Sequence, residues 1–102
     1  MYVAGADNDV IYQYTLSTAY DVSTSSYANK SLDVGDQTER PCGIRFNNDG
    51  TKLFVTDFDS YYINEYALTT AYDVSSASFS HTFDISAKTT FPMSVSFNME
   101  DT

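Results

Sequence analysis

The sequence has few of the residues from which catalytic and metal sites are commonly built. Its 102 residues include one cysteine, Cys42, one histidine, His81, and no tryptophan. One cysteine excludes an intramolecular disulfide and has no metal-site spacing, and one histidine excludes a two-histidine metal cluster. A Gly-x-Ser-x-Gly element, a Cys/His pair and a phosphate-binding loop are all missing. The sequence therefore offers little support for catalysis, and Cys42 is predicted to be a buried apolar residue of a strand.

Basic residues are also scarce, with five Lys and Arg against 14 Asp and Glu and a net charge of −9. This balance argues against nucleic acid and against an anionic membrane surface as partners. The acidic surface is interpreted as a solubility feature, with cations or cationic partners as the alternative. No run of 18 apolar residues occurs, and no basic and then apolar leader follows Met1. The chain is thus expected to be soluble, without a transmembrane segment or signal peptide, and its compartment is not indicated.

What the chain does contain is a repeat. The hexapeptide TAYDVS occurs at Thr18–Ser23 and again at Thr70–Ser75, an offset of 52 residues. At this offset, 12 of the 27 pairs between residues 1–27 and 53–79 are identical. From Asp33 and Asp84 onward the offset is 51, so the first copy has one extra residue near positions 28–31. The chain is therefore one unit of two copies, about 1–52 and 53–102, without a linker.

Each copy has the pattern of four β-strands. The abundant Tyr, Phe, Thr and Val favour strands, and apolar residues alternate with polar ones. Asn47–Gly50 contains the Asp-Gly pair that is typical of a hairpin turn. The Ser/Thr-rich segment 17–26 is too short for a stable helix and is expected to be an ordered connection anchored by buried Tyr20 and Val22. The eight predicted strands are, in order within each copy, Cys42–Phe46 and Met93–Phe97, Lys52–Thr56 and Met1–Ala4, Val10–Leu16 and Tyr62–Leu68, and Ser31–Val34 and Thr82–Ile85.

Four antiparallel strands in a repeated unit of about 50 residues are typical of a β-propeller blade. The stretch PCGIRFNNDGTKLFV resembles the blade motif of the YVTN and NHL/TolB-like propeller repeats, and YVAGADNDVIYQYTL resembles the continuation of that motif. The second copy departs from the motif, since PMSVSFNMEDT lacks the Asp-Gly turn. The resemblance implies an all-β propeller with two four-stranded blades per chain. It says little about function, because these families include binding, scaffolding and enzymatic members.

The phase of the repeat predicts that the ring closes by homo-oligomerisation. The chain begins at the second strand of a blade, Met1–Ala4, and its last strand, Met93–Phe97, is a first strand without a second. Head-to-tail strand exchange between copies would pair them, and six blades from three chains are preferred over eight from four. A fragment of a longer propeller is a further interpretation. The residues assigned to the oligomer interface are Met1, Tyr2, Val3, Met93, Val95 and Phe97.

Ligand sites of such a ring are expected on the loops at residues 5–9, 57–61, 35–40 and 86–91. Four acids in these loops suit a hard cation such as Ca²⁺, namely Asp7, Asp9, Asp57 and Asp59. The alternative is that they only form turns, because an Asp side chain often hydrogen-bonds the backbone of its own turn. Glu39 and Arg40 are interpreted as a rim ion pair or an anion site. Phe58 and Phe91 are candidates for stacking on a carbohydrate or peptide. The leading hypothesis is a non-catalytic binding or scaffold module without a cofactor, and the alternative is a metal-assisted hydrolase or lactonase-like propeller enzyme.

Overall fold

The computed structural model describes residues 1–5, 8–38, 40–57, 61–88 and 95, and within these residues the regular structure is almost entirely β-strand. The two short exceptions are single turns of 3-10 helix, η1 (Val22–Thr24) and η2 (Val74–Ser76). No helix in the described part of the chain is long and apolar enough to cross a membrane. The all-β prediction is confirmed. The strands are β1 (Tyr2–Gly5), β2 (Val10–Leu16), β3 (Ser25–Asp33), β4 (Pro41–Phe46), β5 (Lys52–Asp57), β6 (Tyr62–Leu68) and β7 (Ala77–Asp84).

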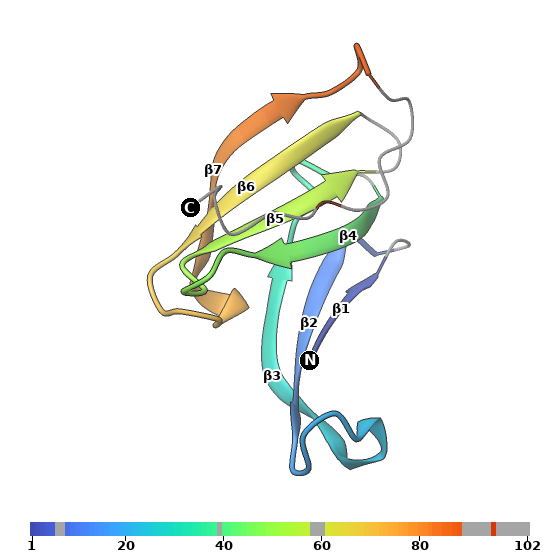
Figure 1. Cartoon of the computed structure of the whole chain (residues 1–102), viewed down its shortest axis with the longest axis vertical. Coiled ribbons are helices and arrows are strands. Elements are labelled where there is room, and N and C mark those ends of the chain that lie inside the picture. The colour runs from blue at the N-terminus through green and yellow to red at the C-terminus, as the bar shows by residue number, and fades with distance from the viewer. Residues whose placement is uncertain (6–7, 39, 58–60, 89–94, 96–102) are drawn as a thin grey trace.

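The strands form two antiparallel sheets that follow one another along the chain (Figure 1). The first sheet has the order β1-β2-β3, and the second has the order β4-β5-β6-β7. Strand β4 comes from the first copy of the repeat but pairs with β5 from the second copy. In the described part of the chain, the first sheet has no strand equivalent to β4, so β1 pairs on one side only.

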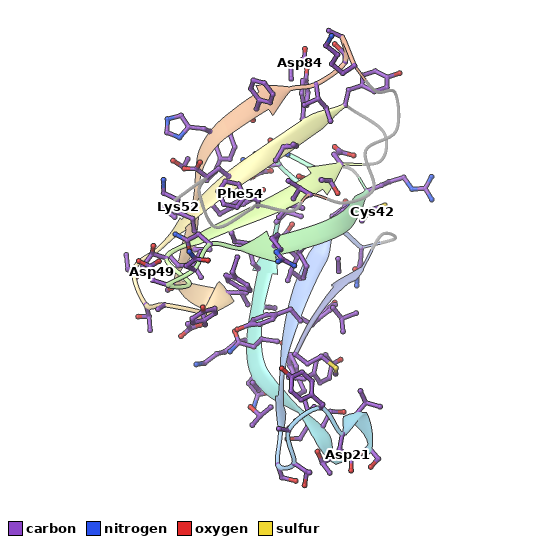
Figure 2. All side chains as sticks on the ribbon, in the orientation of Figure 1. Asp21, Cys42, Asp49, Lys52, Phe54 and Asp84 are labelled. Carbon is purple, nitrogen blue, oxygen red and sulfur yellow. The ribbon has the colours of Figure 1, made fainter. Side chains whose placement is uncertain are left out.

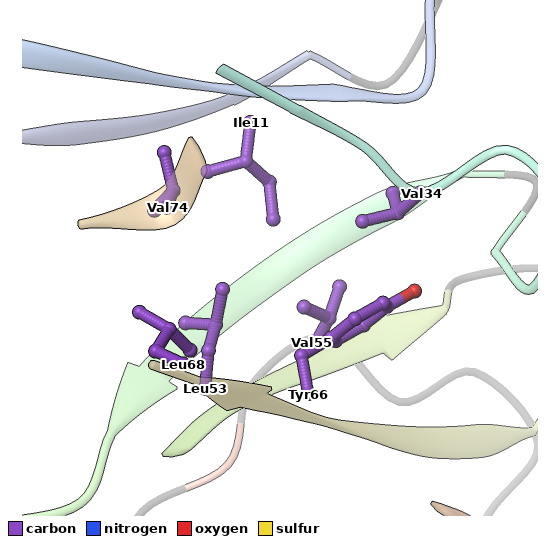
Figure 3. Packing of buried hydrophobic residues seen from close by; sticks show 7 residues of the cluster. All are labelled: Ile11, Val34, Leu53, Val55, Tyr66, Leu68 and Val74. Carbon is purple, nitrogen blue, oxygen red and sulfur yellow. The ribbon is translucent and has the colours of Figure 1, made fainter. Parts of the chain in front are cut away.

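The hydrophobic core lies between the two sheets (Figure 3). Five of its side chains belong to the second sheet and η2. The other two are Ile11, from the first sheet, and Val34, from the segment that follows that sheet. Burial of an aliphatic side chain of this size stabilises a fold by about 1.5–3 kcal/mol. The two sheets are therefore held together by one shared core. Its seven residues are Ile11, Val34, Leu53, Val55, Tyr66, Leu68 and Val74.

A buried polar network attaches the segment between the sheets to β6. Asn64 Nδ2 donates to Thr38 Oγ1 at 2.8 Å, and Asn64 Oδ1 accepts from Thr82 Oγ1 at 2.6 Å. The hydroxyl of Tyr66 donates to Gln37 Oε1 at 3.1 Å, and burial raises the pKa of Tyr66 to about 12. Because buried polar groups cost free energy unless they are paired, these contacts favour the observed position of the connecting segment against β6.

The two copies of the repeat adopt the same unusual local geometry. Asp9 and Tyr61 are equivalent at an offset of 52, and both have a φ of 60°. Their carbonyl oxygens each accept a 2.9 Å hydrogen bond, from Val34 and Ile85 respectively. A positive φ is uncommon for residues other than glycine, so its recurrence shows that equivalent sequences fold in the same way.

The extra residue of the first copy lies in a β-bulge. Gln13 pairs with Lys30 and Tyr14 with Tyr27, which leaves two residues unpaired in β3. At the equivalent place in β7, only Ser80 is unpaired. The inserted residue thus changes the bulge and leaves the register on both sides of it unchanged.

The predicted Asp-Gly hairpin turn is confirmed between β4 and β5. Gly50 has a φ of +74° and donates its N–H to the carbonyl of Asn47. A Cβ at Gly50 would overlap the ring of Tyr72, which packs over the turn. Glycine is therefore required here both for its backbone conformation and for space.

The expectations about three residues, Cys42, Tyr20 and Val22, and about the start of the fourth strands are wrong. Cys42 is exposed, and it lies at a register shift between Pro41 and Gly43 in β4 (Figure 2). Tyr20 and Val22 were expected to be buried, but they are 100% and 68% exposed. The fourth strands begin earlier than predicted, since β3 and β7 extend back to residues 25 and 77.

Candidate functional site: the outer faces of the two sheets

Each sheet has an outer face, turned away from the shared core, and the outer face of the first sheet is apolar. Met1 is 40% exposed, Val3 44% and Val22 68%. Met1, Leu16, Tyr20 and Val22 line a hollow of about 400 Å³ on this face. The surface lies over β1, β2 and η1, and the tip that carries η1 projects away from the second sheet, as the position of Asp21 shows (Figure 2).

The outer face of the second sheet is also hollowed and apolar. A depression of about 330 Å³ lies over β5, β6 and β7. Phe83, in this depression, is 66% exposed. Exposed aromatic and aliphatic side chains that gather in one place are typical of a binding surface. The residues that line the depression are Phe54, Ile63, Glu65, His81, Thr82, Phe83 and Val95.

Three ionisable groups meet at the side of this depression. Glu65 Oε2 lies 3.6 Å from His81 Nδ1 and 3.9 Å from Lys52 Nζ. His81 Nδ1 is also 2.7 Å from the hydroxyl of Ser80. The depression therefore has an apolar floor with a carboxylate and an imidazole at its edge. The carboxylate can accept a hydrogen bond from a peptide N–H, and the imidazole can donate one to a carboxylate.

Within the chain, the two sheets meet where the turn that carries η2 contacts the first sheet. This contact, called the joint from here on, shows how such a face is covered. The turn that carries η2 rests on β2 and β3 of the first sheet. Val74 is fully buried there, and its N–H donates to Gln13 Oε1 at 3.0 Å. Beside it, Lys30 Nζ lies 3.2 Å from Asp73 Oδ2.

The repeat relates the two outer faces to the two halves of this joint. The inner face of the second sheet contains Leu53, Val55, Leu68 and Val74, and their equivalents at an offset of 52 are Met1, Val3, Leu16 and Val22 of the first outer face. The second outer face has the same relationship to the inner face of the first sheet. At an offset of 52, Phe54, Ile63 and Glu65 of the outer face are equivalent to Tyr2, Ile11 and Gln13. After the inserted residue the offset is 51, and His81 and Phe83 are equivalent to Lys30 and Leu32. Each outer face is therefore the counterpart of a surface that is covered elsewhere in the same chain.

The oligomer interface predicted from the repeat phase is described for four of its six residues. Met1 and Val3 are on the first outer face, whereas Tyr2 points inward, where its ring packs 4.7 Å from Phe46 and its hydroxyl donates to the Tyr72 carbonyl at 2.6 Å. Val95 lines the depression on the second outer face. Met93 and Phe97 lie outside the described residues. The predicted interface does not include Val22, Glu65, His81 and Phe83, although the offset that relates them to Val74, Gln13, Lys30 and Leu32 is visible in the sequence.

The predicted loop acids are described in part. Asp57 is fully buried, and its Oδ1 accepts from the backbone N–H of Arg40 at 3.3 Å. Asp9 shapes its turn through its backbone, and its Oδ1 is buried without a hydrogen-bond partner among the described residues. The described residues contain no group of three or more His, Cys, Asp and Glu side chains that would hold a metal ion. Asp7, Glu39, Phe58, Asp59 and Phe91 lie outside the described part of the chain.

Comparison with protein-family models, curated proteins and solved structures finds no match for this chain.

Proposed function

We propose that the chain is a non-catalytic scaffold module, a two-blade unit of a β-propeller that completes its ring by binding copies of itself. The observation that carries the proposal is the pair of outer faces. Each is apolar and hollowed, and each corresponds by the repeat to a surface that is buried within the chain. A repeat unit buries its faces only against neighbours, and two units leave one face of each sheet uncovered.

The open side of β1 supports the same proposal. Its equivalent β5 pairs on both sides, with β4 and β6. Strand β1 pairs with β2 alone in the described part of the chain. Residues 93–97 of a second copy, equivalent to 42–46, would supply the missing strand. Open edges and exposed apolar faces are covered together in a closed ring, which removes both.

The mass of the intact chain in solution tests the proposal. Light scattering after size exclusion should show one species of three chains, or of four if eight blades form, at micromolar concentration. Removal of residues 93–102 should abolish this species, because the strand that enters the next copy is lost. A folded monomer of the intact chain at micromolar concentration would contradict ring closure and indicate a self-contained two-sheet protein.

A further inference from the structure

The two outer faces differ in what they present: one carries a projecting turn, and the other carries a depression. We propose that the Asp21–Val22 turn of one copy docks in the depression between Phe54 and Phe83 on the second sheet of another copy. The inference rests on the proposed self-assembly and adds the residues that form the joint. The occupant of the depression is thus a second copy of this chain.

The apolar part of the joint follows from Val74. This side chain is fully buried where η2 meets the first sheet, whereas the equivalent Val22 on η1 is 68% exposed. Val74 belongs to the same core cluster as Ile11 of the first sheet, and the partly buried Tyr2 and Leu32 of that sheet pack against the cluster. Ile63, Phe54 and Phe83 are equivalent to these three residues of the first sheet and line the depression. Val22 therefore has a matching surface on the second sheet, which its own chain does not place against it.

The polar part of the joint follows from two contacts of the same turn. Val74 N–H donates to Gln13 Oε1, and Asp73 Oδ2 pairs with Lys30 Nζ. In the second joint, Glu65 replaces Gln13 and His81 replaces Lys30. Both replacements can make the equivalent contact, because a carboxylate accepts from the Val22 N–H and an imidazole N–H donates to the Asp21 carboxylate.

The docking turn is already formed in the free chain. Asp21 Oδ1 accepts from the Ser23 N–H at 3.1 Å, as Asp73 Oδ1 accepts from the Ser75 N–H at 3.0 Å. The residue before each of these aspartates also has the same backbone conformation in both turns, since Tyr20 and Tyr72 have φ values of 61° and 63°. A turn that keeps its bound geometry before binding loses little conformational entropy when it docks.

Two substitutions block the two halves of this joint separately. Val22→Asp places a charge on the turn, and Phe83→Asp places one in the depression. Both positions are largely exposed in the single chain, at 68% and 66%, so each variant should keep the melting temperature of a monomer. Ala87→Asp is the matched control, because it adds the same charge at an exposed turn where the equivalent residue is already Asp36.

The expected result is that each blocking variant is a monomer, and that a 1:1 mixture of the two forms a heterodimer. In the mixture, the intact turn of the Phe83→Asp chain meets the intact depression of the Val22→Asp chain, and only one joint can form. Introduction of His81→Lys into the Val22→Asp chain should tighten this heterodimer by about two- to fivefold, because Lys30 is the residue that the internal joint uses. Ala87→Asp should assemble like the unmodified chain.

The outcomes separate this inference from the proposed ring. If the unmodified chain forms a discrete ring and both blocking variants still form it, the joint assigned here is wrong and the ring is closed elsewhere. If the mixture gives a heterodimer but the unmodified chain forms open chains of variable length, the joint holds and ring closure fails. If both variants stay monomeric in the mixture, or bind an unrelated protein or their own C-terminal residues around Val95 instead, the second copy is not the occupant.

Discussion

The Nζ of Lys30 lies 3.2 Å from Oδ2 of Asp73, and this pair connects β3 of the first sheet with the turn that carries η2 of the second. The other oxygen of Asp73 caps the same turn by accepting from the N–H and hydroxyl of Ser75. One carboxylate therefore organises its own turn and also holds that turn against the neighbouring sheet.

The titration of Asp73 should report on both contacts. The hydrogen bond from Ser75 and, after it, the contact with Lys30 lower the pKa of Asp73 below its ordinary value of 3.8. Since the folded pKa is the lower one, the carboxylate stabilises the fold above that ordinary value, and this contribution is lost as the pH falls through the folded pKa. We expect Ser75→Ala to raise the pKa of Asp73 more than Lys30→Ala does, as measured by NMR titration. Ser23→Ala, the same change in the first copy, should leave the Asp73 titration unchanged, and a shift there would argue against a local cause.

The turn between β4 and β5 should be sensitive at Gly50. Gly50→Val places a β-branched side chain at a positive φ, and its Cβ would overlap the ring of Tyr72. We expect a loss of at least roughly 1 kcal/mol in the free energy of unfolding, from urea denaturation at fixed chain concentration. Asn48→Val, an exposed position in the same turn, is the control and should change the stability by less than about 0.5 kcal/mol. Equal effects of the two substitutions would mean that the φ of Gly50 is not the cause.

The buried amide of Asn64 should be required for the connection between the sheets. Asn64→Leu would leave the hydroxyls of Thr38 and Thr82 without the partner that each has now. Thr38 is fully buried, and because an unsatisfied buried polar group costs roughly 1–3 kcal/mol, the melting temperature should fall clearly. Asn8→Ala, which removes an exposed amide bonded to the Tyr12 hydroxyl, should have little effect. A stable Asn64→Leu variant would show that the network is dispensable.

Addition of Ca²⁺ should leave the melting temperature unchanged. Asp57 is the last residue of β5, it is buried, and its carboxylate already accepts a hydrogen bond from the backbone N–H of Arg40, 17 residues earlier in the chain. A matched concentration of Mg²⁺ controls for ionic strength. A rise with Ca²⁺ alone that depends on its concentration would indicate binding to the native state and would restore the cation interpretation.

Much of the local structure is predictable from the sequence. The range 10–16 for β2 and the range 62–68 for β6 follow from alternation, and the Asp-Gly pair locates the hairpin turn at Gly50. The bulge near Asn29 is visible only as a change in offset, and the exposure of Cys42 is not visible at all. Cys42 lies at a register shift between β4 and β5, and such a shift depends on the pairing of the two strands rather than on β4 alone.

By itself, the sequence determined that two nearly equivalent units follow one another and that each would form the same strands, turns and caps. This holds because those features depend on residues close together in the chain, and equivalent residues fold alike. Only the tertiary structure decided which of two equivalent surfaces is covered. Val74 is buried and Val22 is exposed, although the hexapeptides around them are identical, because a chain with two sheets has one joint between them and so covers only one face of each. The same geometry leaves Phe83 in an open depression while its counterpart Leu32 packs against the core.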